Sequence, residues 1–179
     1  MKSTGEVMGI SNDASKSYAK SQIAASQLLP VRGNIFISVN DKDKKAIIPV
    51  AKELHKAVLG IYTSIGTGKI LEENGIPCKV VKKVYEGRPN IVDHIKNKEV
   101  QLIINTPIGR EAREDDKYIR QAAIQYSIPV VTTARGALAT AHAIKSLKNG
   151  IVEVKPLQEY YSVSASLRGG SERADEAIS

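Results

Sequence analysis

Apolar runs alternate with stretches of helical spacing along most of the chain. Residues 34–39 (NIFISV) are rich in apolar, β-branched side chains, which is typical of a buried strand. Beyond them, apolar residues recur at three- and four-residue intervals from Ile47 to Leu59, which predicts a helix capped by Asp41 or Asp43. Later runs of the same two kinds predict four more strands, at 61–64, 78–81, 100–105 and 129–133, and four more helices, at 66–74, 91–98, 111–126 and 136–147.

The alternation of strands and helices indicates the fold class. Strands that are apolar on both faces and separated by helices are typical of a parallel sheet covered on both sides. We therefore predict an α/β protein, a three-layer α/β/α domain with a five-stranded parallel sheet, over residues 31–150. Before this domain, residues 1–12 are predicted to form a loop and residues 15–29 a helix ended by Pro30.

Composition and charge narrow the function classes. The 179 residues are 42% hydrophobic and 25% charged, which is typical of a globular domain. The net charge is +7, and residues 31–150 alone carry +8, so an anionic ligand fits this domain. The single cysteine, Cys78, excludes a disulfide framework and a cysteine-based zinc site. Only 4% of the residues are aromatic and none is Trp, which argues against the stacking of nucleic-acid bases.

The chain carries no membrane or secretion signal that we recognise. No apolar run approaches the roughly 20 residues that span a bilayer. The N-terminal segment, MKSTGEVMGISNDASKS, lacks the hydrophobic core of a signal peptide. We therefore expect a cytoplasmic protein with neither a membrane nor a nucleic acid as its partner.

Polar residues gather where the predicted strands end. The carboxyl ends of parallel strands meet at one edge of the sheet, next to the starts of the following helices, and ligands bind there. Residues 63–69 (TSIGTGK) combine two glycines, hydroxyl side chains and a helix start, which are the features of a phosphate-binding turn. Lys44 and Lys83 are expected at the same edge, where each would add positive charge.

The same residues also have plainer interpretations. The turn lacks the spacing of a P-loop or of a dinucleotide fingerprint, so the motif by itself favours an ordinary connection between strand and helix, and only the two lysines expected beside it favour a phosphate site. The acidic run 114–116 is interpreted as a helix start, because acids stabilise the positive end of the helix dipole. His55, His94 and His142 show no metal-ligand spacing, and no nucleophile–base pair can be assembled. We predict no metal site and no catalytic residue.

Five segments together resemble one known family: GNIFISVNDKDK, TSIGTGKILEENGI, KKVYEGRPNIVDHIKN, LIINTP and YIRQAAIQYSIPVVTT. Over about residues 31–148 they are similar to the C-terminal allosteric domain of the carbamoyl-phosphate synthetase large subunit, which has a methylglyoxal-synthase-like fold. The leading MKSTGEVMGI also resembles the end of the ATP-grasp (carbamoyl-phosphate) domain that precedes it. The resemblance implies three parts: 1–30, the end of the ATP-grasp domain and a linker; 31–150, the regulatory domain; and 151–179, a C-terminal extension. After about residue 162 this extension is rich in Ser, Gly and charge, which predicts disorder.

The resemblance implies a regulatory domain without catalysis of its own, which binds a nucleotide monophosphate effector such as UMP or IMP. The effector-binding positions that match the family are Ser38, Lys44, Ser64, Thr67, Lys83, Asn105 and Thr106. Pro107 stands where some members have Thr, and proline supplies neither a hydroxyl nor an N–H, so the identity of the effector stays open. Asp115 and Thr132 match the regulatory-domain side of the family's ornithine site, which lies between two domains.

The parent protein that the resemblance implies is a glutamine-dependent, ATP-dependent ligase of arginine and pyrimidine biosynthesis. Its cofactors, ATP with Mg or Mn, belong to the ATP-grasp domains, and none is expected in this fragment. Its partners are the ATP-grasp domains of the same subunit, the glutaminase small subunit and further copies of the subunit in a homo-oligomer. The alternative is a stand-alone methylglyoxal synthase-type lyase acting on dihydroxyacetone phosphate. That enzyme carries a catalytic aspartate where residues 85–89 read YEGRP, without Asp, so the regulatory hypothesis is favoured.

Overall fold

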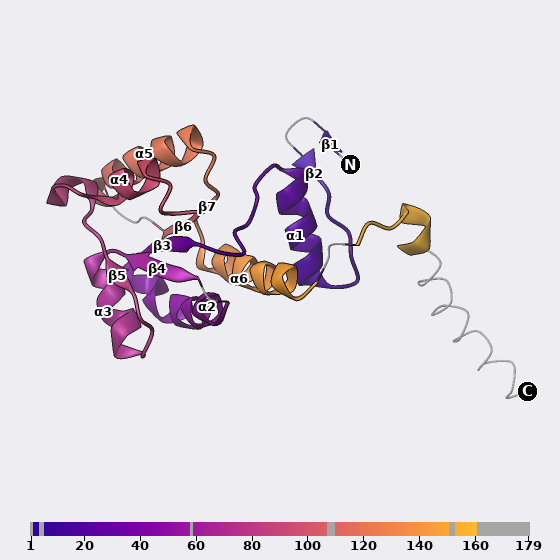
Figure 1. Cartoon of the computed structure of the whole chain (residues 1–179), viewed down its shortest axis with the longest axis horizontal. Coiled ribbons are helices and arrows are strands. Elements are labelled where there is room, and N and C mark those ends of the chain that lie inside the picture. Colours follow the sequence, from indigo (N-terminus) through magenta and orange to yellow (C-terminus); the bar gives the residue numbers. More distant parts are fainter. Residues whose placement is uncertain (1, 4–5, 58, 107–109, 151–152, 161–179) are drawn as a thin grey trace, which may run out of the picture.

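Five short parallel strands form the central sheet, as the sequence predicts (Figure 1). The computed structural model describes residues 2–3, 6–57, 59–106, 110–150 and 153–160, without the side chains of 2–3 and 110–115. All neighbouring strands are parallel, in the order β5 (Lys79–Val80), β4 (Gly60–Thr63), β3 (Asn34–Val39), β6 (Leu102–Thr106) and β7 (Val130–Val131). The chain builds outward from β3 in one direction and then returns to its other side. A change of direction between β3 and β6 results, and ligands bind at such a point in an open α/β sheet.

Helices cover both faces of the sheet and complete the predicted three layers. The first face carries α2 (Lys44–Lys56), α3 (Ile65–Glu73) and α6 (Ala134–Asn149), and the second carries α4 (Ile91–Lys96) and α5 (Arg110–Gln125). Strand β3 shows the reason, because successive side chains point to opposite faces. Ile35 and Ile37 pack with the first set of helices, whereas Phe36 between them packs with the second.

The helix after β3 begins differently from the expectation. A 3-10 turn, Asp41–Asp43, precedes α2, and the side chain of Asn40 caps it by accepting hydrogen bonds from the backbone N–H groups of Lys42 and Asp43 at 2.9 and 3.2 Å. Asp43 occupies the N-cap position of α2, as one of the two expected alternatives has it, but its side chain makes no cap hydrogen bond. Asn40 caps the 3-10 turn because it directly follows the strand and its short side chain reaches the N–H groups two and three residues ahead.

The N-terminal residues include a small hairpin where a loop is predicted. Strand β1 (Lys2–Ser3) pairs antiparallel with β2 (Glu6–Val7), with Lys2 opposite Val7. Strands of two residues are too short to show an alternating pattern, which explains why the sequence does not reveal them.

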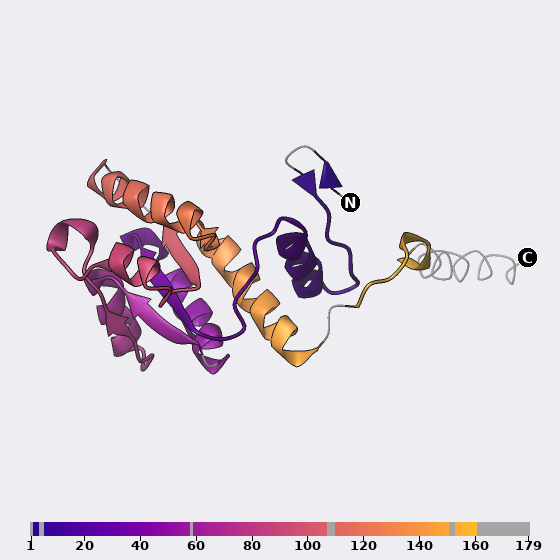
Figure 2. The same ribbon diagram turned by 45° about the horizontal axis from the view of Figure 1, so that its top comes forward.

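Helix α1 (Ala14–Ala24) packs against α6 (Figure 2). The hydroxyl of Tyr18 lies 3.2 Å from the hydroxyl of Thr140 on α6, and Ala19 is buried in the same contact region. The helix is shorter than predicted, because the chain turns at Ser26, whose φ is 62°, before it reaches Pro30. The contact ties the N-terminal segment to the layer that covers the first face of the sheet.

Part of the C-terminal extension falls outside the described residues. The disorder expected after about residue 162 falls on residues that the structure does not describe, so it stays a prediction. In the ranges that are described, no helix has both the length and the apolar character that crossing a membrane requires.

Candidate functional site

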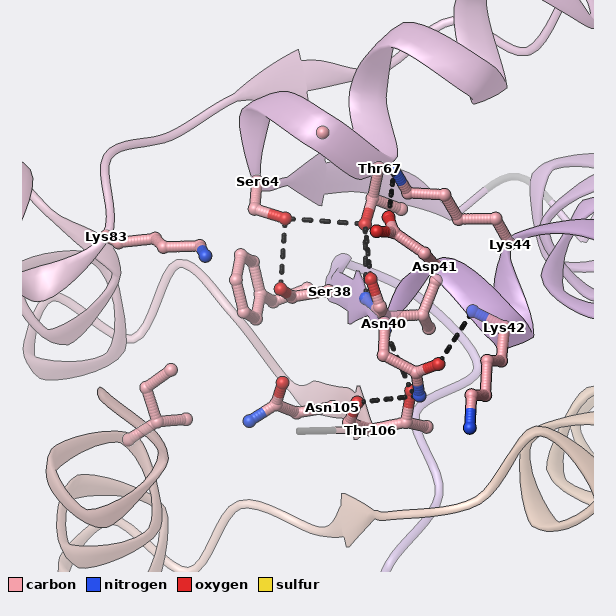
Figure 3. A pocket seen from close by; sticks show the side chains of 14 residues that line it. Ser38, Asn40, Asp41, Lys42, Lys44, Ser64, Thr67, Lys83, Asn105 and Thr106 are labelled. Carbon is pink, nitrogen blue, oxygen red and sulfur yellow. Dashed lines mark hydrogen bonds and ion pairs between the residues drawn. The ribbon is translucent and has the colours of Figure 1, made fainter. Parts of the chain in front are cut away.

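A cavity of about 410 Å³ opens at the carboxyl ends of β3, β4 and β6 (Figure 3). It lies at the change of direction between β3 and β6, and its size is within the usual range of small-molecule sites. The seven residues expected to bind an effector all line it: Ser38, Lys44, Ser64, Thr67, Lys83, Asn105 and Thr106. The fold thus gathers side chains from separate segments into one site, while their contact with a ligand stays a prediction.

Three hydroxyl groups form a connected row along one wall of the cavity. The Ser38 and Ser64 hydroxyl oxygens are 2.9 Å apart, and Ser64 donates to the Thr67 hydroxyl at 3.4 Å. Ser38 is the last residue but one of β3, Ser64 directly precedes α3, and Thr67 lies in the first turn of that helix. Because hydroxyl hydrogens rotate freely, the same groups can donate to an anion.

Thr67 and Ser64 differ in how far the fold already uses them. Thr67 is buried, with 1% of the residue exposed. Its hydroxyl accepts a hydrogen bond from the backbone N–H of Val39 at 3.1 Å. Ser64 precedes the first residue of α3 but makes no side-chain cap bond, so its hydroxyl is directed to its neighbours in the cavity. Ser64 is therefore the freer donor, and Thr67 also holds β3 against α3.

The two glycines of the phosphate-binding turn have different roles. Gly66 lines the cavity, and a methyl group added there would meet only the Lys44 ammonium, at 3.6 Å. Gly68 instead faces the sheet, where an added methyl would lie 2.9 Å from a methyl of Thr63 and 3.0 Å from one of Val80. Only the first glycine opens the backbone to a ligand, and the second lets α3 pack closely on β4 and β5.

Replacing Gly68 with alanine is expected to lower the free energy of unfolding by about 1–2 kcal/mol. Overpacking of a close-packed site costs about 1–3 kcal/mol, and the better helix propensity of alanine recovers up to about 1 kcal/mol of it. Urea unfolding of Gly68→Ala beside Gly66→Ala measures the difference. Gly66→Ala, the control, is expected to leave the free energy of unfolding unchanged or slightly raised. Equal urea midpoints for the two variants would contradict the packing role of Gly68.

Two lysines approach the cavity from opposite sides (Figure 3). Lys44 begins α2, and its ammonium is 2.7 Å from the carboxylate of Asp41. The hydrogen bond from Lys44, together with its charge, holds the pKa of the Asp41 carboxyl below its ordinary value. Lys83 precedes the 3-10 turn Val84–Glu86, and no carboxylate in the described ranges forms an ion pair with it. With Lys42, which also lines the cavity, the site offers three positive charges, and among the described residues only that of Lys44 is in an ion pair.

Asn40 is a cavity residue that the predicted site lacks. Its amide nitrogen donates to the Thr106 hydroxyl at 2.9 Å and to the Thr106 carbonyl at 3.0 Å, and its backbone N–H donates to the same hydroxyl at 3.2 Å. These bonds join the end of β3 to the end of β6. Thr106 is thus partly a structural residue, and the position of Asn40 directly after the strand is the signal that marks it.

Asn105 is held by Asp116, an acidic residue of α5. The amide nitrogen of Asn105 donates to Asp116 at 2.8 Å, and Arg120 forms an ion pair with the other oxygen of this carboxylate at 2.5 Å. Helix α5 begins at Arg110, so Asp116 lies in its second turn and does not cap it. The interpretation of Asp116 as a helix start is therefore wrong.

The remaining predicted residues lie away from these contacts or outside the described part. Thr132 is exposed and directly follows β7. Asp115 belongs to α5 by its backbone, but its side chain is not among those described, and Pro107 lies outside the described residues altogether. Within the described ranges, no three His, Cys, Asp or Glu side chains lie close enough together to hold a metal ion.

Comparison with known proteins finds relatives over most of the chain. Residues 46–132 match the family described as MGS-like domain. The carbamoyl phosphate synthase large chain of Nostoc sp. is 45% identical over 160 residues, which are 89% of this chain and 14% of the relative. The C-terminal section of the carbamoyl phosphate synthase large chain of Aquifex aeolicus is 48% identical over 168 residues, which are 91% of this chain and 31% of the relative. The chain thus spans less than a third of the length of either relative.

A solved structure shares the fold. The crystal structure of methylglyoxal synthase from Elizabethkingia anophelis superimposes with a TM-score of 0.50 over 61% of this chain and 76% of that protein. Only 22% of the aligned residues are identical, so the likeness shows the fold alone. It confirms the expectation of a methylglyoxal-synthase-like α/β fold.

Proposed function

Residues 46–132 belong to the MGS-like domain family, and the chain is related to the C-terminal part of carbamoyl phosphate synthase large chains. From this premise we propose that the chain is a regulatory domain of such an enzyme. In this proposal the chain binds a nucleotide monophosphate effector, such as UMP or IMP, at the ends of β3, β4 and β6. The observation that carries it is the convergence of three lysines, four hydroxyls and two side-chain amides on one cavity. Cationic groups, hydroxyls and a helix N-terminus are the donors that bind the oxygens of a phosphate ester.

The arrangement of donors suggests how such a ligand lies. The phosphate is placed between Lys44 and Lys83, where Ser64 and Thr67 add hydroxyl donors and α3 points its positive end at the anion. The remainder of the nucleotide extends toward Asn105 and Thr106 at the end of β6. In this orientation the phosphate lies against the lysines, and the sugar and base lie against the uncharged side chains of Asn105 and Thr106.

Regulation follows from differential affinity. An effector that binds more tightly to one arrangement of this domain and its neighbours shifts the population toward that arrangement. In the proposal those neighbours are the ATP-grasp domains of the same subunit, which bind ATP with Mg or Mn, and the glutaminase small subunit. Copies of the large subunit also associate, and the whole enzyme serves arginine and pyrimidine biosynthesis. All of these partners belong to the larger protein of which the matched relatives are examples.

A second ligand, ornithine, belongs to the same proposal. Thr132 is exposed at the carboxyl end of β7, where a neighbouring domain can reach it. With Asp115 it supplies the regulatory-domain side of the ornithine site, and the other side belongs to a catalytic domain. This chain alone is therefore expected to bind ornithine weakly.

A lyase acting on dihydroxyacetone phosphate is the less favoured function. The resemblance to a methylglyoxal synthase structure concerns the fold, because only 22% of the residues are identical. Proton abstraction next to a carbonyl requires a base positioned at the substrate. The segment 85–89 (YEGRP), where the lyase carries its catalytic aspartate, contains none.

A thermal-shift panel tests the proposed function. The ligands are UMP, IMP, dihydroxyacetone phosphate, ornithine and inorganic phosphate, each at several concentrations. A ligand present at 100 times its dissociation constant stabilises the folded state by about 2.7 kcal/mol. Stabilisation by UMP or IMP at concentrations where inorganic phosphate has no effect supports the proposal. Stabilisation by dihydroxyacetone phosphate alone, with release of methylglyoxal, would support the lyase instead.

Replacing Asp41 with asparagine is expected to tighten nucleotide binding about two- to fivefold. Its carboxylate holds the ammonium of Lys44 at 2.7 Å and repels an incoming phosphate. The side chain of Asp41 is 91% exposed, and a pair of this kind contributes up to about 1 kcal/mol, which sets the upper limit. Titration calorimetry of Asp41→Asn measures the change. Glu73→Gln, an exposed position at the end of α3, makes the same change in charge away from the cavity and should leave affinity unaltered.

A further inference from the structure

The cavity wall at the end of β6 is held by a chain of three polar side chains, of which Asn105 and Asp116 are buried and Arg120 is exposed. Asn105 and Asp116 are only 6% and 7% exposed. The amide nitrogen of Asn105 donates to one oxygen of Asp116 at 2.8 Å, and the guanidinium of Arg120 donates to the other at 2.5 Å. The chain connects the end of β6 to α5, and neither Asp116 nor Arg120 lines the cavity.

The fold brings these groups together for a simple reason. Asn105 is the register partner of Ser38 across β3 and β6, so both side chains lie on the same face of the sheet. That face also carries Phe36 and Ile103 and is covered by α5. Asp116 lies four residues before Arg120 on this helix, on which side chains four apart are neighbours.

Asp116 decides which end of the Asn105 amide faces the cavity. A carboxylate paired with arginine accepts hydrogen bonds and cannot donate them. The amide of Asn105 must therefore turn its NH₂ group toward Asp116, and its carbonyl oxygen is directed toward the side of Ser38 (Figure 3). The cavity then presents donors at the lysines and hydroxyls but a fixed acceptor at Asn105.

We propose that Asp116 is a positioning residue that makes the site select, at Asn105, a ligand group that donates a hydrogen bond. This inference rests on the proposed function, since the ligand is a nucleotide monophosphate whose phosphate occupies the lysine end. The donor is a ribose hydroxyl or the N–H of the base, and either satisfies the same acceptor. A ligand whose group at this point only accepts leaves the buried carbonyl oxygen without a partner.

The wild-type protein provides the first test, by titration calorimetry with UMP, 2′,3′-dideoxy-UMP and N3-methyl-UMP. Loss of one hydrogen bond in a buried site weakens binding about three- to tenfold. We expect this loss for one of the two analogues, and the analogue affected identifies the donor as a hydroxyl or as the base N–H. Equal affinity for all three ligands would overturn the proposal while leaving the proposed function intact. If no nucleotide binds, both are wrong.

Asp116→Asn provides the second test. An asparagine side chain both donates and accepts, so the Asn105 amide is released to turn over. We expect the difference between UMP and the sensitive analogue to fall below about twofold, with the affinity for inorganic phosphate unchanged. Asp93→Asn is the matched control, because Asp93 also pairs with an arginine, Arg88, but on α4 and outside the cavity. It should retain the full discrimination.

A purely structural role for Asp116 predicts a different result. If it only tied α5 to β6, Asp116→Asn would weaken UMP, both analogues and inorganic phosphate by the same factor and leave their ratios unaltered. That result overturns the proposal. If the variant fails to fold, the comparison of ligands on the wild-type protein still decides whether the acceptor at Asn105 selects a donor.

Discussion

Replacing Lys83 with alanine is expected to weaken nucleotide binding on the order of ten- to a hundredfold. Lys83 lines the cavity, and no carboxylate in the described part of the chain forms an ion pair with it, so its charge is available to a phosphate. A charge-assisted hydrogen bond contributes about 1.5–3 kcal/mol, which corresponds to this range of affinity. Titration calorimetry at two salt concentrations measures the effect, and binding should also weaken as salt rises.

The control for Lys83 is a lysine of equal charge outside the cavity. Lys45 is exposed on α2, next to Lys44 in sequence, and does not line the cavity. Lys45→Ala should leave affinity within about twofold, because a distant exposed charge is largely screened by salt. Neither variant should change the free energy of unfolding by more than about 0.5 kcal/mol. Equal weakening in both would indicate diffuse attraction of anions, and no weakening in either would place the ligand elsewhere.

Replacing Phe36 with alanine is expected to lower the free energy of unfolding by about 3–5 kcal/mol. Phe36 is 1% exposed on the central strand, packs with the buried residues of α4 and α5 and forms part of the cavity wall. Removal of its ring loses the transfer free energy of the aromatic group and leaves a void that the neighbouring β-strands cannot fill. Urea unfolding followed by circular dichroism measures the loss.

An exposed apolar residue of α5 provides the control for Phe36→Ala. Ile124 is 80% exposed on this helix, so Ile124→Ala should cost no more than about 0.5 kcal/mol. A loss below about 1 kcal/mol for Phe36→Ala would mean that the cavity wall carries little of the stability. The variant should also bind UMP more weakly, because removal of the ring changes the shape of the cavity wall that Phe36 helps to form.

The strands and helices of the core can be predicted from local patterns of apolar residues in the sequence. Continuous Val and Ile runs such as 34–39 mark strands buried on both faces, and helical apolar spacing marks the segments between them. Because the carboxyl ends of parallel strands share one edge, the strand-end residues Ser38, Ser64 and Asn105 could be expected at one place. In the structure they line a single cavity.

The sequence alone determined the α/β class, the five parallel strands and the edge at which polar side chains gather, since each depends on continuous apolar runs, on helical apolar spacing and on the alternation of the two along the chain. Only the tertiary structure decided which side chains meet there. The capping role of Asn40, the close approach at Gly68 and the contact of Asp116 with Asn105 depend on how each helix is rotated and set against the sheet. Periodicity indicates the buried face of a helix but not its register against a strand. That register is set by packing between segments far apart in the chain.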